Sequence, residues 1–465
     1  MNSASWQSLP LIERRHYLQQ ARSKPIAHSL IQLVRAPVGW GVYASMGPNY
    51  QFAVFGRDSI EYAEDVMEYF PELTREIIGV MARLQGHETN AVTEEEPGKI
   101  HHEYRKLQFN GKRASAGSAK LLEYLLSLWG VAGATELRYY GSIDATPLFV
   151  RLVGAFVSRY GNDILSDTVT HYSGKKVTIN EALASAVNWI ASKIEASEWG
   201  LLEFKRLNPR GLPYQAWKDS ETAFLHTDGS RANADSGIAS VEVQGFAFDA
   251  LQVAAWLLDI SGERRRRLLQ LAQRLAHATI DHMWLPHEQF FAMGVDRDEA
   301  GQPRKIATLT SNAGLLLQTG LLSAVDHDGA LAYVSPVVER LMSNVDFFTP
   351  AGIRCRSLRH AQLLQVADYH GSFVTWPKDT SNIAEGFRAW GFETEASVLE
   401  KHLIESIIAA GEAYEFFFVD RENHAKLHYR IEQQDEPKLH DLGAANTPEP
   451  MQAWTLACFL KLMLR

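Results

Sequence analysis

The chain has 465 residues, of which 46% are hydrophobic and 22% are charged, the composition of an ordinary globular protein. Its formal net charge of −9 argues against a nucleic-acid partner, because nucleic-acid-binding domains usually carry a basic face. Cys355 and Cys458 are too few for a disulfide framework, and we expect two buried free thiols. The N-terminus lacks the pattern of a secretory signal, and no stretch reaches the roughly 18 apolar residues of a membrane span. We therefore expect a cytoplasmic protein with no membrane partner, and the sequence indicates no oligomeric state.

Apolar residues recur every three or four positions along most of the chain, which is the spacing of amphipathic helices. In chain order this pattern predicts a helical lead-in over 1–35 and helices after Asp58, after Pro71, at 118–133, after Asp144, at 181–197, 241–261 and 265–284, after Thr310, at 332–343, after Pro377, and at 395–413 and 451–464. Strand-like alternation is confined to stretches near 289–297, 305–309 and 415–430, and the most polar stretch, 420–446, is expected to be a surface excursion. About a dozen helices with few strands predict an all-α fold, and the absence of a long polar linker favours a single domain over 1–465.

The loops between the predicted helices are rich in aromatic residues that stand next to charged ones. Connecting loops usually carry small polar residues instead. Aromatic faces beside a few polar groups are what a small-molecule pocket requires, and they suit sugars, which have apolar C–H faces and polar edges. The alternative is that the rings only cover the ends of helices. The aromatic residues concerned are Trp40, Tyr43, Tyr50, Phe52, Phe55, Tyr139, Tyr140, Tyr214, Trp217, Tyr369, Trp376 and Trp390.

Eight segments of the chain carry distinctive motifs, and their order is informative. They are FGRDS (55–59), EEEPGKIHHEYR (94–105), YYGSIDATPLFVRLVG (139–154), QAWKDS (215–220), VEVQGFAFDA (241–250), YHGSFVTWPKDTSNIAEGFRAWGF (369–392), AYEFFF (413–418) and PEPMQAWT (448–455). In this order they resemble the signature segments of the amylo-α-1,6-glucosidase part of glycogen debranching enzymes. Within WPKD (376–379) a lysine stands where that family has histidine or asparagine.

The resemblance implies an (α/α)6 toroid, in which six helical hairpins surround a central pocket. It also implies a small carbohydrate substrate and hydrolysis of a glucosidic bond with inversion. Inverting hydrolysis requires two carboxyl groups about 6.5–9.5 Å apart, one to protonate the leaving oxygen and one to activate water. The positions that match the family are Asp219 as general acid and Glu415 as general base.

Asp219 lies in a loop that we expect to precede a helix. As a general acid it needs a raised pKa, and an apolar wall formed by Trp217 and Tyr214 would supply it. The alternative is that Asp219 caps the following helix, because an Asp before Ser and Glu is a common N-cap.

Glu415 stands among four aromatic residues. Burying a carboxylate in such surroundings is costly unless it has a partner or a function. The alternative is an exposed strand residue, and Glu412 and Glu449 are competitors for the role of base. Glu449 is interpreted as structural, because a helix N-terminus favours an acid through its dipole alone.

The other polar residues of the matched segments are candidates for binding sugar hydroxyls, since hydrogen bonds from such groups reject a wrong epimer. The alternatives are that Asp58, Asp144 and Thr146 cap helices and that the charged residues of 94–105 only pair with one another. The candidate sugar-binding residues are Arg57, Asp58, Glu96, Lys99, Glu103, Arg105, Tyr140, Asp144, Trp217, Lys218, Glu242, Gln244, His370, Trp376 and Asp379.

Motifs for metal or nucleotide binding are missing from the sequence, so no cofactor is expected: HHEYR is not H-E-x-x-H, and no phosphate-binding glycine loop occurs. Other enzymes of the same toroid remain open, namely a phosphorylase, an invertase-like hydrolase or an epimerase. An epimerase would use paired histidines, and His101, His102, His370 and His402 are scattered. A non-catalytic saccharide-binding protein is the alternative outside enzymes, and the presence of both Asp219 and Glu415 argues against it.

Overall fold

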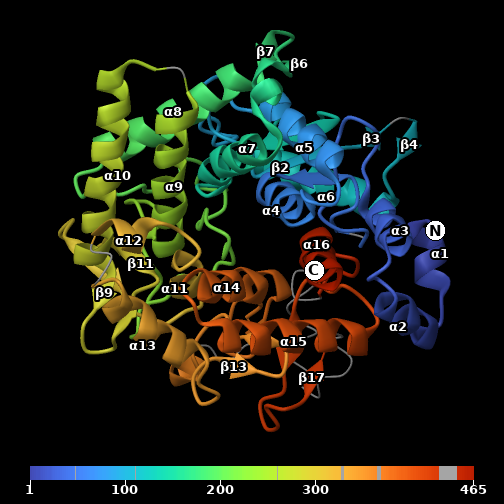
Figure 1. Ribbon diagram of the computed structural model, residues 1–465. Coiled ribbons are helices and arrows are strands. Elements are labelled where there is room, and N and C mark those ends of the chain that lie inside the picture. The colour runs from blue at the N-terminus through green and yellow to red at the C-terminus, as the bar shows by residue number, and fades with distance from the viewer. Residues whose placement is uncertain (48, 110, 259, 326–328, 364–367, 429–447) are drawn as a thin grey trace.

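The computed structural model describes residues 1–465 except 48, 110, 259, 326–328, 364–367 and 429–447. Helices dominate the described part of the chain and the strands are two to four residues long, which is consistent with the predicted helical toroid. Six helices pack in a closed ring: α4 contacts α7, which contacts α9, and the contacts pass on through α11, α14 and α16 back to α4. Figure 1 shows this ring around a central space. The bounds of its helices are α4 Gly56–Val66, α7 Ala145–Tyr160, α9 Val241–Leu257, α11 Asn312–Leu316, α14 Pro377–Ala389 and α16 Ala453–Leu464.

A second set of helices lies outside the ring (Figure 1). Each packs on the ring helix that precedes it in the chain, except that α16 is covered by α3, so the two ends of the chain lie side by side. The outer helices are α3 Lys24–Val34, α5 Pro71–Leu84, α8 Ile179–Ala196, α10 Gly262–Met283, α13 Leu331–Leu341 and α15 Glu393–Ala410. The remaining helices are α1 Ser3–Ser8, α2 Leu11–Gln19, α6 Ala116–Trp129, α12 Leu321–Val325 and the 3-10 helices Asn162–Ser166 and Leu358–Leu363.

Sequence patterns explain which helices lie inside. The ring helix α9 is apolar on nearly all sides and is buried along most of its length, as a helix covered all round must be. Its outer partner α10 begins GERRRR and keeps its charges exposed. Glycine allows close packing within the ring: a Cβ on Gly154 of α7 would lie 2.5 Å from Val253 of α9, and one on Gly314 of α11 would lie 2.8 Å from Ile383 of α14.

Short antiparallel sheets tie the loops at one end of the ring. Strand β2 pairs with β1 and β5, β11 pairs with β12 and β8, and β16 pairs with β15 and β17. The third sheet matters for the site, because it places Phe417 opposite Thr375 and so brings the AYEFFF segment to the WPKD segment. The bounds are β1 Ala53–Phe55, β2 Glu103–Lys106, β5 Glu136–Tyr139, β8 Ala239–Ser240, β11 Gly294–Arg297, β12 Pro303–Ile306, β15 Val374–Thr375, β16 Phe417–Val419 and β17 Leu427–His428. Four two-stranded hairpins complete the strands: β3 Gln108–Phe109 with β4 Lys112–Arg113, β6 Thr168–Thr170 with β7 Lys176–Thr178, β9 Trp284–Leu285 with β10 Phe290–Phe291, and β13 Phe348–Thr349 with β14 Gly352–Ile353.

Every helix predicted from periodicity is confirmed, with ends that differ by a few residues. The sheet formed by β1, β2 and β5 was not predicted, because its strands are short and carry charged residues such as Glu103 and Arg105. Cys355 and Cys458 are buried free thiols, as expected. Of the expected surface excursion, residues 421–426 are mostly exposed, and 429–446 lie outside the described residues.

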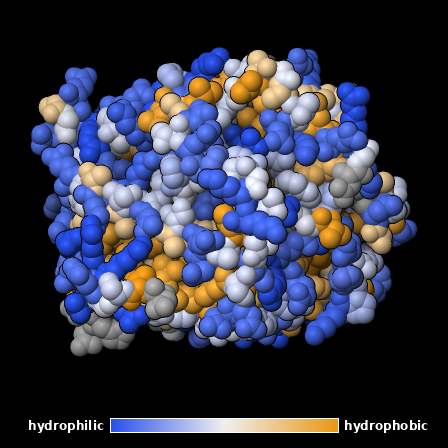
Figure 2. Space-filling view, turned by 90° about the horizontal axis from the view of Figure 1, so that it is seen from above, coloured by the Kyte–Doolittle hydropathy of each residue, from blue (hydrophilic) through white to orange (hydrophobic). Residues whose placement is uncertain are grey.

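The surface has the character expected from the composition. Figure 2 shows a face that is mostly hydrophilic, with smaller apolar areas between the polar ones. Scattered apolar surface of this kind is normal for globular proteins. Within the described ranges, none of the helices has the length and hydropathy that crossing a membrane requires.

Candidate active site

The ring helices begin at one end of the ring, and polar side chains stand at those beginnings. Contacts between these first turns link neighbouring helices. Gln452, just before α16, donates to Asp58 in the first turn of α4 at 3.2 Å. Arg57 of α4 pairs with Asp144 just before α7, and Lys378 of α14 pairs with Glu61 of α4 at 3.1 Å. Carboxylates are favoured at helix N-termini by the dipole, so this end of the ring can hold several acids close together.

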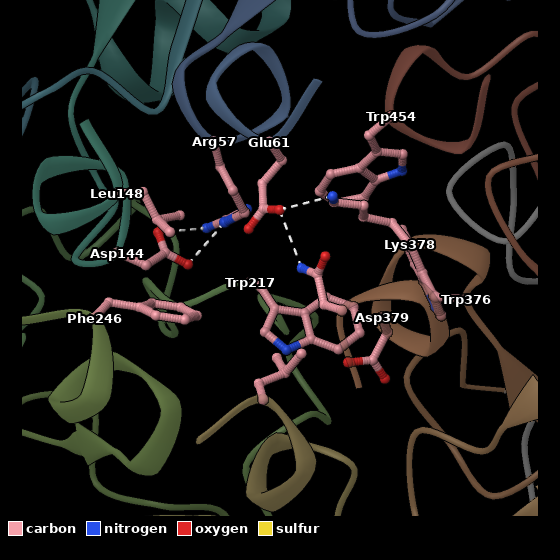
Figure 3. A pocket seen from close by; sticks show the side chains of 12 residues that line it. Arg57, Glu61, Asp144, Leu148, Trp217, Phe246, Trp376, Lys378, Asp379 and Trp454 are labelled. Atoms are coloured by element: carbon pink, nitrogen blue, oxygen red, sulfur yellow. Dashed lines mark hydrogen bonds and ion pairs between the residues drawn. The ribbon is translucent and has the colours of Figure 1, made fainter. Parts of the chain in front are cut away.

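Arg57 and Asp144 form a buried, two-pronged ion pair. Arg57 Nε donates to Asp144 Oδ2 at 2.7 Å, and Nη2 donates to Oδ1 at 3.0 Å. Ser142 Oγ adds a donor to the same carboxylate at 2.7 Å. This satisfied geometry is the form in which an ion pair can be buried. Both residues were predicted site residues, and they line the central cavity together (Figure 3).

Asp219 is presented by a loop that is fixed on both sides of it. The preceding Lys218 donates from Nζ to Ser311 Oγ at 2.7 Å and to the Cys355 carbonyl at 2.8 Å. The following Ser220 donates to Asp368 at 3.2 Å. Asp219 itself remains partly exposed, and its carboxylate accepts a hydrogen bond from Tyr369 Oη at 3.3 Å. The loop therefore holds one carboxylate in place without using it for structure.

Glu415 is 7% exposed and lies just before β16. Its Oε2 accepts the backbone N–H of Glu449 at 3.4 Å. Asp219 and Glu415 are 196 residues apart in the chain, yet both carboxylates raise the pKa of the same two side chains, Tyr50 and Tyr369. The fold thus brings the two predicted catalytic carboxylates to one place.

Four carboxylates crowd this place, and we call Asp58, Asp219, Glu415 and Glu449 the acidic centre. Burial raises the pKa of Asp58 and that of Asp219 to about 6, against the attraction of Arg57. Burial first, and the charge of Glu449 second, raise the pKa of Glu415 well above its usual range. Such shifts toward neutrality suit groups that exchange protons at physiological pH.

Aromatic rings form an apolar wall beside the acidic centre. Trp217 and Trp376 meet edge to face with centroids 5.5 Å apart, and His370 stacks on Trp376 at 5.1 Å. Burial and nearby cations lower the pKa of His370 well below its usual range, so its ring is neutral. Beside this wall lies a small cavity of about 20 Å³ inside the ring, lined by Trp217, Trp376, Arg57, Asp144 and Asp379 among others (Figure 3).

The predicted residues Glu96, Lys99 and Tyr140 do not meet the acidic centre. Glu96 pairs with Lys193 of the outer helix α8, and Lys99 Nζ donates to the Glu94 carbonyl at 3.2 Å. Tyr140 is fully buried and donates to the Leu84 carbonyl at 2.9 Å. For Glu96 and Lys99 these contacts are of the kind that the alternative of charged residues pairing with one another describes.

Glu103 and Arg105 pair with each other on β2. Arg105 lies over the rings of Tyr50 and Phe55, with its guanidinium carbon 5.9 Å from each centroid, so it stands at the edge of the site. Gln244 is fully used by the backbone, because its side chain accepts from Leu202 N at 2.8 Å and donates to Leu202 O at 3.0 Å.

Three predicted residues, Lys218, Glu242 and Asp379, lie in a buried polar group under Trp217. Burial lowers the pKa of Lys218, and it raises the pKa of Asp379 to about 6 and that of Glu242 to about 7. Glu242 accepts a hydrogen bond from Ser240 Oγ, while its Oε1 has no hydrogen-bond partner among the described residues.

The side chains that were considered as helix caps make other contacts in the structure. The N-cap of α4 is Phe55, and Asp58 stands inside the first turn instead. Asp144 occupies the N-cap position of α7, yet its carboxylate binds Arg57 rather than the helix, and Thr146 accepts from Ile100 N at 2.9 Å. No helix of the described chain follows Asp219 before α9, so it cannot act as a cap there. In each case a long-range partner replaced the local one.

From the sequence, Tyr50 and Tyr369 were named only among the loop aromatics, Gln452 was not singled out, and Glu449 was interpreted as structural. In the structure Tyr50, Tyr369 and Gln452 contact or face the acidic centre, and Glu449 is part of it. The tyrosines were noticed as loop aromatics, but nothing in the linear sequence distinguished them from the others. Among the described residues, no group of three or more His, Cys, Asp or Glu side chains is placed to hold a metal ion.

No protein-family model and no curated protein sequence matches the chain. Solved structures do match it over nearly its whole length. A wild-type glycosidase is 12% identical, covers 97% of this chain and 98% of its own, and has a TM-score of 0.58. The GH63 mannosylglycerate hydrolase from Thermus thermophilus, solved in complex with glucose, is 12% identical over 95% of this chain and 99% of its own, with a TM-score of 0.57. An uncharacterized conserved protein from the same organism is 12% identical over 94% of this chain and 98% of its own, with a TM-score of 0.59. At such low identity the likeness establishes a shared fold.

Proposed function

We propose that this chain is a glycoside hydrolase that cleaves an α-glucosidic bond of a small oligosaccharide or glucoside with inversion, in the manner of amylo-α-1,6-glucosidases. In this proposal the whole chain forms one (α/α)6 toroid with a single catalytic centre. The observation that carries it is the meeting of Asp219 and Glu415 beside an aromatic wall. Glycosidases of the same fold that were solved in complex with glucose lend support.

Asp219 acts as the general acid. A carboxyl with a pKa of about 6 retains its proton far better at neutral pH than an ordinary aspartic acid, whose pKa is 3.8. It therefore can protonate the glycosidic oxygen as the bond to the anomeric carbon breaks. Tyr369 holds the carboxyl in one orientation, and the fixed neighbours Lys218 and Ser220 hold the loop.

Glu415 acts as the general base. It removes a proton from a water molecule, whose oxygen attacks the anomeric carbon from the face opposite the leaving group. A raised proton affinity makes an ionised carboxylate a stronger base. Because Asp219 and Glu415 repel each other, they titrate as a pair, and the active form holds one proton between them.

The substrate contacts follow from the side chains around the acidic centre. Trp217 and Trp376 supply the apolar surface beside the acidic centre that suits the C–H face of a glucose ring. Asp58 and the guanidinium of Arg57 supply an acceptor and donors at the start of α4 for its hydroxyls. His370 adds a neutral ring beside them.

The test is release of free glucose from a panel of α-glucosides: isomaltose, panose, trehalose, sucrose, glucosylglycerate and a limit dextrin. Wild-type protein is compared with Asp219→Asn and Glu415→Gln, each of which should lower the rate by about 10²-fold or more. Turnover that survives either substitution would show that the catalytic residues lie elsewhere. No release from any substrate, with or without added phosphate, would favour an epimerase or a saccharide-binding protein.

A further inference from the structure

Glu415 and Glu449 belong to segments that support each other directly. Glu415 donates its backbone N–H to the carbonyl of Glu449 at 3.0 Å, and the N–H of Glu449 points back to the Glu415 carboxylate at 3.4 Å. Next to them, Gln452 N donates to the carbonyl of Ala413 at 2.8 Å. The segment that carries Glu449 therefore sets both the backbone and the side chain of Glu415.

The carboxylate of Glu449 is itself held by Ser45 and Asn49. Asn49 Nδ2 donates to Oε1 at 2.6 Å, and Ser45 Oγ donates to Oε2 at 3.1 Å. Gly47 completes the enclosure, because a Cβ at this position would lie 1.6 Å from Oε2. Its own N–H orients the Ser45 hydroxyl at 2.7 Å. Only glycine leaves room for the carboxylate here.

Glu449 is only 4% exposed. The donors that hold it are a hydroxyl and an amide, both neutral. Burial raises the pKa of Glu449 itself, while the hydrogen bonds from Asn49 and Ser45 and the charge of Arg105 oppose that rise and favour its ionised form. The nearest guanidinium, that of Arg105, is engaged by Glu103 and attracts Glu449 from a greater distance.

We propose that Glu449 is a positioning residue for the general base: Ser45 and Asn49 hold its carboxylate, and its backbone N–H fixes the Glu415 carboxylate that takes up the proton of the attacking water. This inference rests on the proposed function, in which Glu415 is that base. The step balances without another reactant, since the water proton passes to Glu415 and the hydroxyl oxygen bonds to the anomeric carbon. The groups that also face Glu415 are Asp58 of α4, Asp219 of the 215–220 loop, Tyr50 and Tyr369.

The sign of the effect follows from the like charge. A neighbouring carboxylate raises the pKa of Glu415, in addition to the larger effect of burial. Replacing Glu449 with a neutral residue of the same shape should lower the pKa of Glu415. The acidic limb of the pH profile of kcat/KM reports the ionisation of the base in the free enzyme.

The experiment measures this profile for wild type and Glu449→Gln on whichever α-glucoside is hydrolysed. We expect the acidic limb of Glu449→Gln to move to lower pH by about one unit, the size of a typical neighbouring-charge effect, with a several-fold lower kcat. Gly47→Ala, which displaces the Glu449 carboxylate without removing it, should also shift the limb. The matched control is Glu412→Gln. Glu412 is buried like Glu449 and lies three residues before Glu415, but its carboxylate bonds Trp6 and Arg14 instead.

An acidic limb that stays in place in both Glu449→Gln and Gly47→Ala would overturn the proposal, whatever happens to kcat, because a merely structural contact does not alter the proton affinity of the base. A limb that moves equally in Glu412→Gln would overturn it as well. If Glu449→Gln does not fold, Gly47→Ala alone decides. Failure of the proposed function is distinguishable, because then Glu415→Gln itself remains active or wild type releases no sugar.

Discussion

We predict that the buried carboxyl group of Glu242 lowers the stability of the folded protein at high pH. Its side chain is fully buried at the start of α9, and its Oε1 finds no hydrogen-bond partner in the described part of the chain. Burial raises its pKa from 4.5 to about 7. A carboxyl with a raised pKa binds its proton more tightly in the folded state, so the stability contributed by that proton is complete below pH 4.5 and is lost as the pH rises through 7.

The magnitude follows from the shift of Glu242. At about 1.4 kcal/mol for each pH unit, ionising the folded protein above pH 7 costs about 3 kcal/mol. Glu242→Gln removes this cost and keeps an oxygen that can accept from Ser240. The variant also loses the favourable interaction of the charged form with the helix dipole, which offsets up to about 1 kcal/mol of this gain in stability. We therefore expect Glu242→Gln to be more stable than wild type by about 2–3 kcal/mol at pH 8 and by less than about 1 kcal/mol at pH 5.

Urea unfolding of both proteins at pH 5 and pH 8 measures this difference, and comparing variant with wild type at each pH cancels the other titrating groups. Glu123→Gln on the exposed surface of α6 is the control and should change stability by less than about 0.5 kcal/mol at either pH. A gain for Glu242→Gln that is the same at both pH values would refute the reasoning, as would a loss at pH 8.

Three further predictions concern the acidic centre and its support. Asp144→Ala leaves Arg57 buried without its partner and should lower the free energy of unfolding by about 3–5 kcal/mol, measured by chemical denaturation; a loss under about 1 kcal/mol would contradict a tight pair. Because Asp219 must be protonated and its pKa is about 6, kcat/KM should fall as the pH rises above about 6, and Asp219→Asn should lose this basic limb. The acidic centre should also disfavour an anionic leaving group, so that glucosylglycerol is hydrolysed roughly tenfold faster than glucosylglycerate at low ionic strength. Equal rates for these two substrates would show that a cation compensates the centre.

The sequence predicted the helices well because their information is local. Apolar periodicity is sufficient to place α9 or α10, and a helix that buries one side or all sides differs visibly in composition. The order of the motifs then indicated which loops meet. The short strands β1, β2 and β5 were not predicted from the sequence, because their pairing depends on residues far apart in the chain.

The candidate site was predicted only in part, for a physical reason. Motifs named Arg57, Asp144, Asp219 and Glu415, and the fold brings these together. The same motifs also contain residues such as Gln244, whose polar groups satisfy buried backbone. A linear pattern cannot separate these two uses of a polar side chain, because both place the same residue types next to the same apolar neighbours. Partner identity decides between them, and it is a property of the folded chain.

Hydrolysis of α-glucosyl fluoride, followed by NMR to identify the anomer of glucose first released, separates the role of Asp219 from that of Glu415. Fluoride leaves without protonation, so Asp219→Asn should hydrolyse this substrate at a rate near that of wild type while losing about 10²-fold or more on an ordinary α-glucoside. Glu415→Gln, which cannot activate water, should lose activity on both, and wild type should release β-glucose. A wild type that releases α-glucose, or an Asp219→Asn variant equally impaired on both substrates, would contradict the assignment of Asp219 as acid and Glu415 as base.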